Sequence, residues 1–217
     1  MTKTGAAARP TPTDEGETIV EWVITHQRAL IIGAIVVAVG AGGGWLWQRS
    51  AQIKESRAAE AYQTAESSFM SGNLPLAQTE LEKITTRWSG TAAGGQSASL
   101  LAQIHFDQGR FAEGIAVLES AVSSAPKELR AGMLALLAGG HEGAGKPAEA
   151  AAAFARAADV AQFQLDRQQY RMERARTLRA SGDMAGATAI YTEISQIEDS
   201  PFAGEAKVRL GEILASK

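Results

Sequence analysis

Cysteine is absent from the 217 residues of this chain, and histidine is scarce. Without cysteine, disulfides, thiolate metal sites, cysteine nucleophiles and a bacterial lipoprotein anchor are all excluded. The three histidines, His26, His105 and His141, have no spacing suited to a metal or to general-base catalysis. No pair of nucleophile and base is evident elsewhere. The sequence therefore predicts a protein that is not an enzyme and that has no cofactor or metal site.

Aromatic residues make up only 6% of the chain, whereas hydrophobic residues of all kinds make up 45%. Alanine and glycine are abundant, which favours closely packed helices with small side chains over a sheet of aromatic and β-branched residues. The net charge of −3 provides no basic surface for nucleic acid. We therefore expect an all-α protein that does not bind nucleic acid.

One run of the sequence, residues 29–47 (ALIIGAIVVAVGAGGGWLW), contains no charged residue. At about 1.5 Å per residue, it nearly spans a hydrocarbon core of about 30 Å. Trp45 and Trp47 at its end and Trp22 before it are placed like interfacial anchors. We predict a disordered tail over residues 1–18, an interfacial amphipathic segment over 19–28, a transmembrane helix over 29–47 and a repeat domain over 48–217.

A cleaved signal peptide is the alternative, but acidic residues outnumber basic ones ahead of the run, so a basic n-region is missing. Lysines and arginines flank both ends of the run, and the positive-inside rule does not set its orientation. Within the run, Ala34, Ala38 and Gly42 share one helical face, and Gly40 and Gly44 form a G-x-x-x-G pair. Such faces let two membrane helices approach closely, although small residues are also common in membrane helices generally.

A turn signature centred on glycine recurs four times after the run. The four tripeptides are Ser71-Gly72-Asn73, Gln108-Gly109-Arg110, Ala144-Gly145-Lys146 and Ser181-Gly182-Asp183. Their glycines are 37, 36 and 37 residues apart. Each glycine ends one stretch with apolar periodicity and precedes a second one, which predicts four antiparallel helix pairs. No glycine or proline lies between Trp45 and Ser71, so one helix is expected to continue from the predicted span into the first pair.

In each second helix, a small residue is followed four and seven places later by apolar residues, which places all three on one face. The four triplets are Ala77, Leu81 and Ile84; Gly114, Leu118 and Ala121; Ala150, Phe154 and Ala157; and Ala187, Tyr191 and Ile194. No pair could bury this face alone, so stacking of the pairs is expected. Pro126 and Pro201 are expected to end second helices or to open the next first helix, and residues 202–217 to form a polar-backed capping helix.

Residues 109–126 (GRFAEGIAVLESAVSSAP) resemble the second half of a tetratricopeptide repeat, and residues 145–157 and 182–194 are similar. Gly114 departs from this pattern, because such repeats favour alanine there. Arg171 and Arg174 stand where a first helix usually offers apolar residues, which leaves the register of the fourth pair open. The arginines of this stretch are expected to form a solvated face with i,i+4 pairs; contact with an acidic partner or anionic lipid is the alternative.

The whole chain resembles the tetratricopeptide-like ancillary subunits of the bacterial SecYEG translocon. The resemblance rests on an acidic tail, one membrane helix ending in Trp45 and Trp47, the segment SRAAEAYQTA and degenerate repeats. It implies a single-pass protein of the inner membrane with a cytoplasmic N-terminus and periplasmic repeats. The implied partners are translocon subunits and a membrane-anchored periplasmic chaperone. The segment DSPFAGEAKVRLGEI also resembles repeat proteins of outer-membrane assembly and envelope coordination, so a subunit of another envelope complex is the alternative.

The stacked first helices of such a solenoid line its concave face, which is the expected binding surface. By the repeat resemblance, the residues expected to face a ligand are Tyr62, Glu66, Phe69, Gln96, Ser99, Gln103, Phe106, Glu142, Met172, Arg176 and Arg179. Apolar patches between polar groups suit an extended or helical polypeptide. The Lys and Asn pattern of carboxylate-clamp repeats is absent, so a free C-terminus is not the expected ligand. For Phe69 and Phe106 the alternative is packing between repeats, which is also what we expect of His105 and His141.

Overall fold

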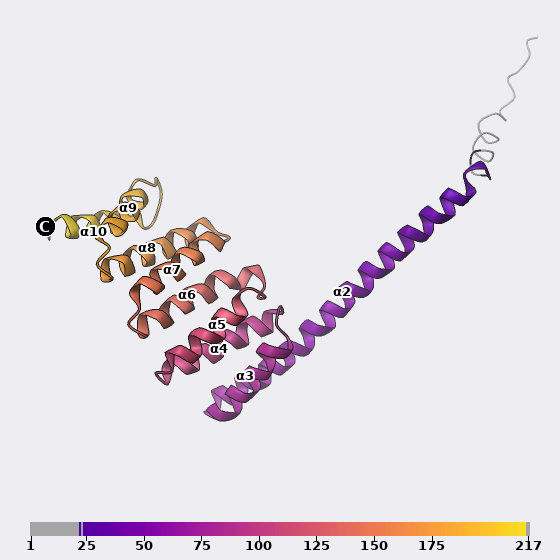
Figure 1. Cartoon of the computed structure of the whole chain (residues 1–217), viewed down its shortest axis with the longest axis horizontal. Coiled ribbons are helices and arrows are strands. Elements are labelled where there is room, and N and C mark those ends of the chain that lie inside the picture. Colours follow the sequence, from indigo (N-terminus) through magenta and orange to yellow (C-terminus); the bar gives the residue numbers. More distant parts are fainter. Residues whose placement is uncertain (1–21, 23, 216–217) are drawn as a thin grey trace, which may run out of the picture. The chain divides into compact units, whose positions relative to one another are not determined.

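The computed structural model describes residues 22 and 24–215, which form helices and turns without a strand among them (Figure 1). The chain divides into two compact units, residues 1–52 and residues 53–217. The predicted disordered tail over residues 1–18 lies outside the described residues, as does part of the predicted interfacial segment.

The first helix of the described chain, α2 (Gln27–Met70), runs for 44 residues. It has no break between Trp45 and Met70, which confirms the predicted continuity of the helix. Among the described residues, no helix is both long enough and apolar enough to cross a membrane. Within the predicted span, the side chains of residues 29, 30, 33–38 and 47 lie outside that description.

The second unit consists of the C-terminal part of α2 and the helices that follow it. These are α3 (Leu74–Arg87), α4 (Ala92–Asp107), α5 (Phe111–Val122), α6 (Lys127–Gly143), α7 (Pro147–Val160), α8 (Gln164–Ala180), α9 (Met184–Ser195) and α10 (Ala203–Ala215). Consecutive helices run antiparallel and pack side by side (Figure 1). The predicted pairs are confirmed as α2/α3, α4/α5, α6/α7 and α8/α9, and α10 follows as one further helix.

Each pair is joined at its predicted glycine, which adopts a left-handed backbone conformation. The φ angles are +80°, +73°, +72° and +91° at Gly72, Gly109, Gly145 and Gly182. The N–H of Gly109 donates to the carbonyl of Phe106 (2.9 Å), and the next N–H donates to the carbonyl of His105 (2.8 Å). The same two bonds recur in the other three turns. This arrangement satisfies the last carbonyls of the first helix and suits a residue without a Cβ atom, which explains the recurrence of glycine.

The second helices bury the predicted faces, since all residues of the four triplets are buried. The largest core cluster joins α4, α5, α6 and α7 around Leu118, Leu137 and Phe154. Smaller clusters join α2, α3 and α4 at one end and α8, α9 and α10 at the other. Each helix pair is therefore stabilised mainly by its neighbours in the stack, as expected of a solenoid.

The fourth pair keeps the register of the others despite its arginines. Helix α8 buries Met172, Ala175 and Thr177, while Arg171 and Arg174 lie half-buried at the edge of that face. Helix α10 follows Pro201 as predicted and buries Ala206 and Ile213. Its outer side exposes Val208 and Leu214, so this cap is less polar than the sequence analysis predicted.

Candidate functional site

The first helices of the first three pairs form an open groove with a volume of about 410 Å³, which we call the first-helix groove. Its lining residues are Tyr62, Gln96, Ser99, Leu100, Gln103, Glu128, Leu129, Gly132, Met133 and Leu136. They come from α2, α4 and α6. Four of them, Tyr62, Gln96, Ser99 and Gln103, were expected from the sequence to face a ligand, and the structure brings these four together.

The floor of the first-helix groove is apolar, and its walls carry polar groups that are neutral except for Glu128. Leu129, Met133 and Leu136 belong to or pack against the largest core cluster, so they are held in place from below. The side chains of Gln96 and Gln103 are exposed, and within the described residues neither carboxamide bonds to another group of the chain. Two groups that can both donate and accept hydrogen bonds therefore remain available to a ligand.

The two other neutral polar side chains of the groove have partners within their own helices. Ser99 Oγ donates to the carbonyl of Gly95 (3.0 Å), and the Tyr62 hydroxyl donates to Glu66 Oε1 (3.3 Å). Burial raises the pKa of the Tyr62 hydroxyl above its ordinary value, and the carboxylate of Glu66 raises it further. Tyr62 therefore stays a neutral hydrogen-bonding group at the edge of the groove.

Leu100 on α4 and the groove residues of α6 were not among the residues predicted from the sequence. A signal for one of them was present, because Gly132 lies 36 residues after Gln96, the same spacing that separates two of the turn glycines. A Cβ atom built at Gly132 would meet nothing within 4 Å, so this position opens into the groove. Leu129 and Leu136 had no comparable signal, since apolar residues of a first helix are equally consistent with the core.

The predicted residues farther along the stack form ion pairs, two of them between helices and one, Arg176 with Glu173, within α8. Arg176 Nη2, on α8, lies 2.7 and 2.9 Å from the carboxylate oxygens of Glu142 on α6, and Arg176 Nε lies 2.7 Å from Glu173. Arg179 Nη1 lies 2.7 Å from Glu212 on α10. Burial alone would lower the pKa of Arg176, but the bonds to Glu173 and Glu142 raise it above its ordinary value. These side chains therefore connect neighbouring helices.

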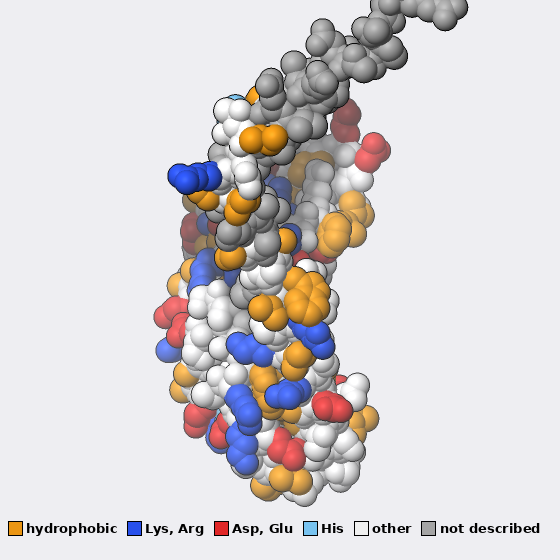
Figure 2. All heavy atoms as spheres, turned by 90° about the vertical axis from the view of Figure 1, so that its right-hand side faces the viewer, with side chains coloured by type: hydrophobic (Ala, Val, Ile, Leu, Met, Phe, Trp, Pro, Cys, Tyr) orange, Lys and Arg blue, Asp and Glu red, His pale blue; other side chains and the backbone are white. Residues whose placement is uncertain are grey.

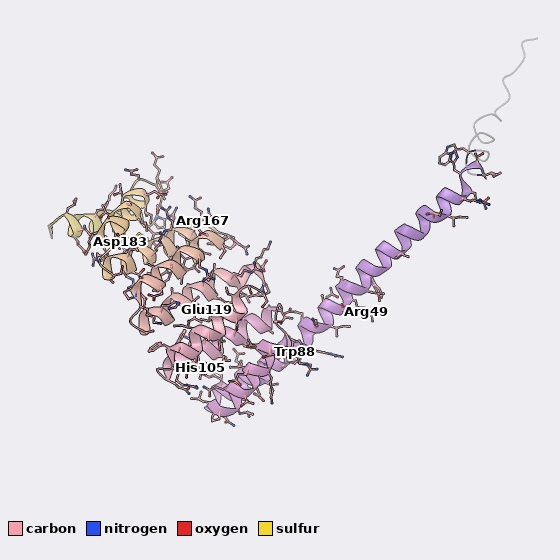
Figure 3. All side chains as sticks on the ribbon, viewed as in Figure 1. Arg49, Trp88, His105, Glu119, Arg167 and Asp183 are labelled. Carbon is pink, nitrogen blue, oxygen red and sulfur yellow. The ribbon has the colours of Figure 1, made fainter. Side chains whose placement is uncertain are left out.

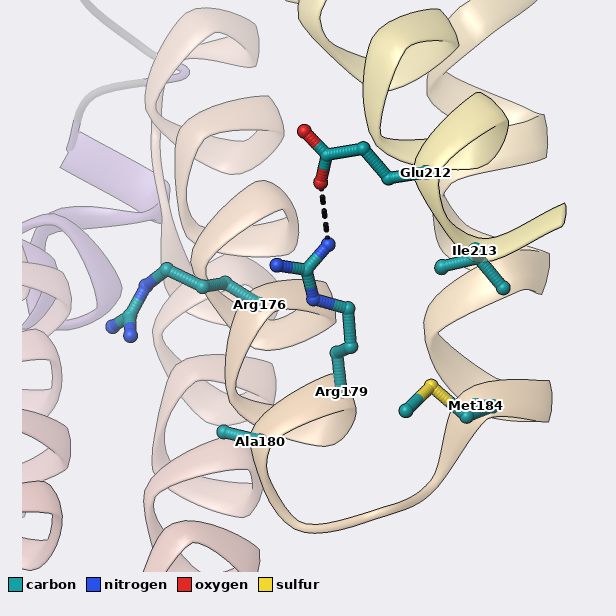
Figure 4. Close-up of a pocket in the computed structure, with 6 residues that line it drawn as sticks. All are labelled: Arg176, Arg179, Ala180, Met184, Glu212 and Ile213. Atoms are coloured by element: carbon teal, nitrogen blue, oxygen red, sulfur yellow. Dashed lines mark hydrogen bonds and ion pairs between the residues drawn. The ribbon is translucent and has the colours of Figure 1, made fainter. Parts of the chain in front are cut away.

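A second pocket, of about 500 Å³, lies beside these ion pairs. Its lining residues are Arg176, Arg179, Ala180, Met184, Glu212 and Ile213. Figure 4 shows Arg179 reaching toward Glu212, while Arg176 extends to the opposite side. The charged groups of this pocket already have partners, in contrast to the carboxamides of the first-helix groove.

The arginines of α8 pair mainly with other elements, which corrects the expectation of i,i+4 pairs within a solvated helix. Arg171 pairs with Glu193 on α9, and Nη2 of Arg167, labelled in Figure 3, donates to the carbonyl of Ala161 (3.1 Å). Helices packed side by side bring these groups within reach, whereas the sequence of one helix shows only its own spacing. The face in Figure 2 likewise shows basic and acidic side chains interspersed.

Two of the predicted ligand-facing aromatic residues pack inside the stack. Phe69 packs on the cluster formed by α2, α3 and α4. Phe106 packs on the largest cluster. A Cβ atom built at Gly114 would lie 2.4 Å from the Phe106 ring, and a Cβ atom built at Gly140 would lie 2.3 Å from it. The ring thus fills the space that two glycines leave open, which explains why Gly114 stands where related repeats favour alanine. Met172, also predicted to face a ligand, is 7% exposed and lies in the last core cluster.

His105 is buried, as expected of a packed side chain at the end of a first helix (Figure 3). Its Nδ1 and that of His141 are buried and have no hydrogen-bond partner within the described residues. Burial lowers the pKa of His105, Arg110 lowers it further, and Glu113 and Glu82 oppose this shift. The folded protein therefore favours the neutral imidazole.

We expect acid to destabilise the wild-type protein more than a His105→Phe variant. Because the pKa of His105 is lower in the folded state than in the unfolded state, its favourable contribution is complete above about pH 6.5 and is lost as the pH falls through the folded pKa. Urea unfolding at several pH values between neutral and mildly acidic would measure the difference in free energy of unfolding. Parallel pH profiles for the two proteins would contradict the assignment.

The small residues predicted to pack membrane helices lie in α2. A Cβ atom built at Gly40, Gly42 or Gly44 would meet nothing within 4 Å, so these positions are open. The side chains of Ala34 and Ala38 lie outside the described residues. The close approach of a second membrane helix at this face stays a prediction.

The fold and the groove define the class of this protein as an α-solenoid of helix–turn–helix repeats with an open surface along its first helices. Residues 21–193 match the family model of the tetratricopeptide repeat-like domain, and the chain belongs to this family. Domains of this family generally mediate protein–protein interaction. No curated protein matches the chain.

Solved structures with the same fold include repeats of a Podosopora anserina protein described as a putative kinesin light chain with nearly identical TPR-like repeats. Its crystal structure is 18% identical, with a TM-score of 0.55, over 73% of this chain and 86% of that one. A single-residue variant of the same repeats gives 18% identity and a TM-score of 0.54 over 73% and 85%. At this identity the similarity concerns the fold alone.

Proposed function

We propose that this chain is a membrane-anchored adaptor that binds other proteins through the first-helix groove. The observation that carries the proposal is the groove itself, with its apolar floor and the two unpaired carboxamides of Gln96 and Gln103. Apolar side chains supply affinity for a polypeptide, and neutral hydrogen-bonding groups set its register. Tetratricopeptide-like domains present such surfaces on a rigid stack of helices.

The proposed membrane anchor of the protein is the uncharged run over residues 29–47, with tryptophans at its end. In the proposal, the N-terminus is cytoplasmic, the repeats are periplasmic, and the small residues of the run contact another membrane helix. The resemblance to ancillary subunits of the SecYEG translocon supports an accessory role in protein export. The proposed partners are translocon subunits and a membrane-anchored periplasmic chaperone acting on exported proteins.

The second candidate is a structural or assembly subunit of another cell-envelope complex. It is favoured by the similarity of residues 199–213 to repeat proteins of that kind and by the exposed Val208 and Leu214 on α10. Exposed apolar side chains on the last helix of a solenoid are available for docking to another subunit. This candidate would use the end of the stack, whereas the first candidate uses the groove.

Affinity purification of the full chain in mild detergent, followed by mass spectrometry, would test the proposal. The informative variant is Gly132→Trp, because Gly132 is exposed and its Cβ position is open, so the indole would fill the groove without disturbing the core. We expect recovery of the polypeptide partner to fall roughly tenfold, the loss of about one good interfacial contact. Translocon subunits among the recovered proteins would support the first candidate over the second.

Gly139→Trp is the matched control. Gly139 is also an exposed glycine of α6 with an open Cβ position, but it does not line the groove. We expect this variant to recover the same partners as the wild type in the same amounts. If the two variants lose their partners equally, or if Gly132→Trp loses none, the groove is not the binding site.

A further inference from the structure

The first-helix groove carries charge of only one sign. Among its lining residues, Glu128 is the one charged side chain, and no lysine or arginine lines the groove. Lys127 Nζ lies 4.0 Å from Glu128 Oε1, but both side chains are largely exposed, so this ion pair is weak. Glu66, which accepts the hydrogen bond of Tyr62, adds a second carboxylate beside the groove. The electrostatic field in the groove therefore favours a positively charged ligand.

The unpaired carboxamides are spaced to hold a polypeptide main chain. Gln96 and Gln103 lie seven residues apart on α4, which corresponds to about 10.5 Å along the helix axis. This is about the length of three residues of extended chain. A carboxamide offers one donor side and one acceptor side, as a peptide group does, so each glutamine can pair with a ligand's backbone. Such contacts bind main chain without selecting a side chain.

Resting on the proposed function, we propose that the first-helix groove takes an internal, extended polypeptide segment in which an apolar side chain is flanked by lysine or arginine. The apolar side chain lies on the floor formed by Leu129 and Leu136, and the basic side chain meets Glu128. Gln96 and Gln103 hold the main chain. A ligand carboxylate, from an acidic side chain or a free C-terminus, meets no cation in the groove and is repelled by Glu128.

This ligand class is tested by measuring how tightly short labelled peptides bind to the detergent-solubilised full chain. Fluorescence anisotropy reports the binding. The peptides are capped at both ends and differ only in the residues that flank a central leucine, which are lysine, glutamine or glutamate. We expect the lysine peptide to bind about five to ten times more tightly than the glutamate peptide, from one gained attraction and one removed repulsion. In Glu128→Gln this preference should shrink to about twofold or less.

The matched control for charge is Glu119→Gln, since Glu119 is an exposed carboxylate of α5 outside the groove (Figure 3). It should keep the wild-type preference for lysine. Replacement of Gln96 and Gln103 together by alanine should weaken the binding of the lysine, glutamine and glutamate peptides by the same factor. Uncapping the C-terminus of the lysine peptide should not strengthen its binding.

The ligand class is wrong if the glutamate peptide binds as tightly as the lysine peptide, if Glu128→Gln keeps the preference, if a free carboxylate is required, or if no peptide binds. The proposed function has a separate test in the Gly132→Trp variant. Partner recovery that depends on the groove, together with any of these four results, would leave the groove as the binding site and overturn only its ligand.

Discussion

Phe154→Ala should lower the free energy of unfolding by about 3–5 kcal/mol, one of the two largest effects that we expect. Phe154 is 6% exposed and belongs to the core cluster that joins α4, α5, α6 and α7. Its neighbours on the same helix face, Ala150 and Ala157, are too small to collapse into the space that the ring would leave. A loss of this size is a large part of the stability of an ordinary domain.

Denaturant unfolding followed by circular dichroism would measure this loss, with Arg156→Ala as the matched control. Arg156 is exposed on the same helix, so its replacement should change the free energy of unfolding by less than about 0.5 kcal/mol. A change below about 1 kcal/mol for Phe154→Ala would mean that the ring does not fill the centre of the stack.

Gly140→Ala should destabilise the protein by about 1–3 kcal/mol, although alanine is normally the better helix former. The added methyl group would lie 2.3 Å from Cζ and 2.7 Å from Cε1 of Phe106, so the ring or the backbone must shift. The neighbouring Gly139 is the matched control, because a Cβ atom there would meet nothing within 4 Å. Gly139→Ala should stabilise the protein by about 0.5–1 kcal/mol.

A double-mutant cycle with Phe106→Leu would show whether the aromatic ring causes the effect. Leucine lacks the Cε and Cζ atoms that the new methyl group would meet, so in this background Gly140→Ala should cost little or nothing. Thermal or urea unfolding of the four proteins measures the coupling between the two positions. Equal costs of Gly140→Ala in both backgrounds would show that another neighbour of Gly140 opposes the methyl group.

Much of the fold was predictable because its signals are local. The turn glycines stop each first helix through backbone bonds that span only about six residues, and a left-handed conformation there favours glycine whatever lies around it. The buried face of each second helix, which includes Leu118 and Ala121 in α5, was predictable. A spacing of three or four residues is enough to place side chains on one side of a helix. The continuity of α2 from Trp45 to Met70 followed from the absence of glycine and proline in that stretch.

The candidate site was predictable only in part. The repeat resemblance predicted that Tyr62, Gln96 and Gln103 lie on the groove side of the first helices, and in the structure all three line one groove. The same resemblance could not show that Met172 is in the core, because a first helix of a solenoid presents apolar residues both to the groove and to the helices behind it. It also gave no sign of the acidic side chain of Glu128 at the groove edge.

By itself, the sequence determined where helices stop, which face each second helix buries and that the pairs must stack, because these depend on neighbours within a few residues. Only the tertiary structure decided that Phe106 fills the space beside Gly114 and Gly140, and that Arg176 pairs with Glu142. Two of these contacts, Phe106 with Gly140 and Glu142 with Arg176, join residues 34 positions apart in the chain. All of them depend on how closely two helices pack and on the direction of each side chain. No local pattern encodes either quantity.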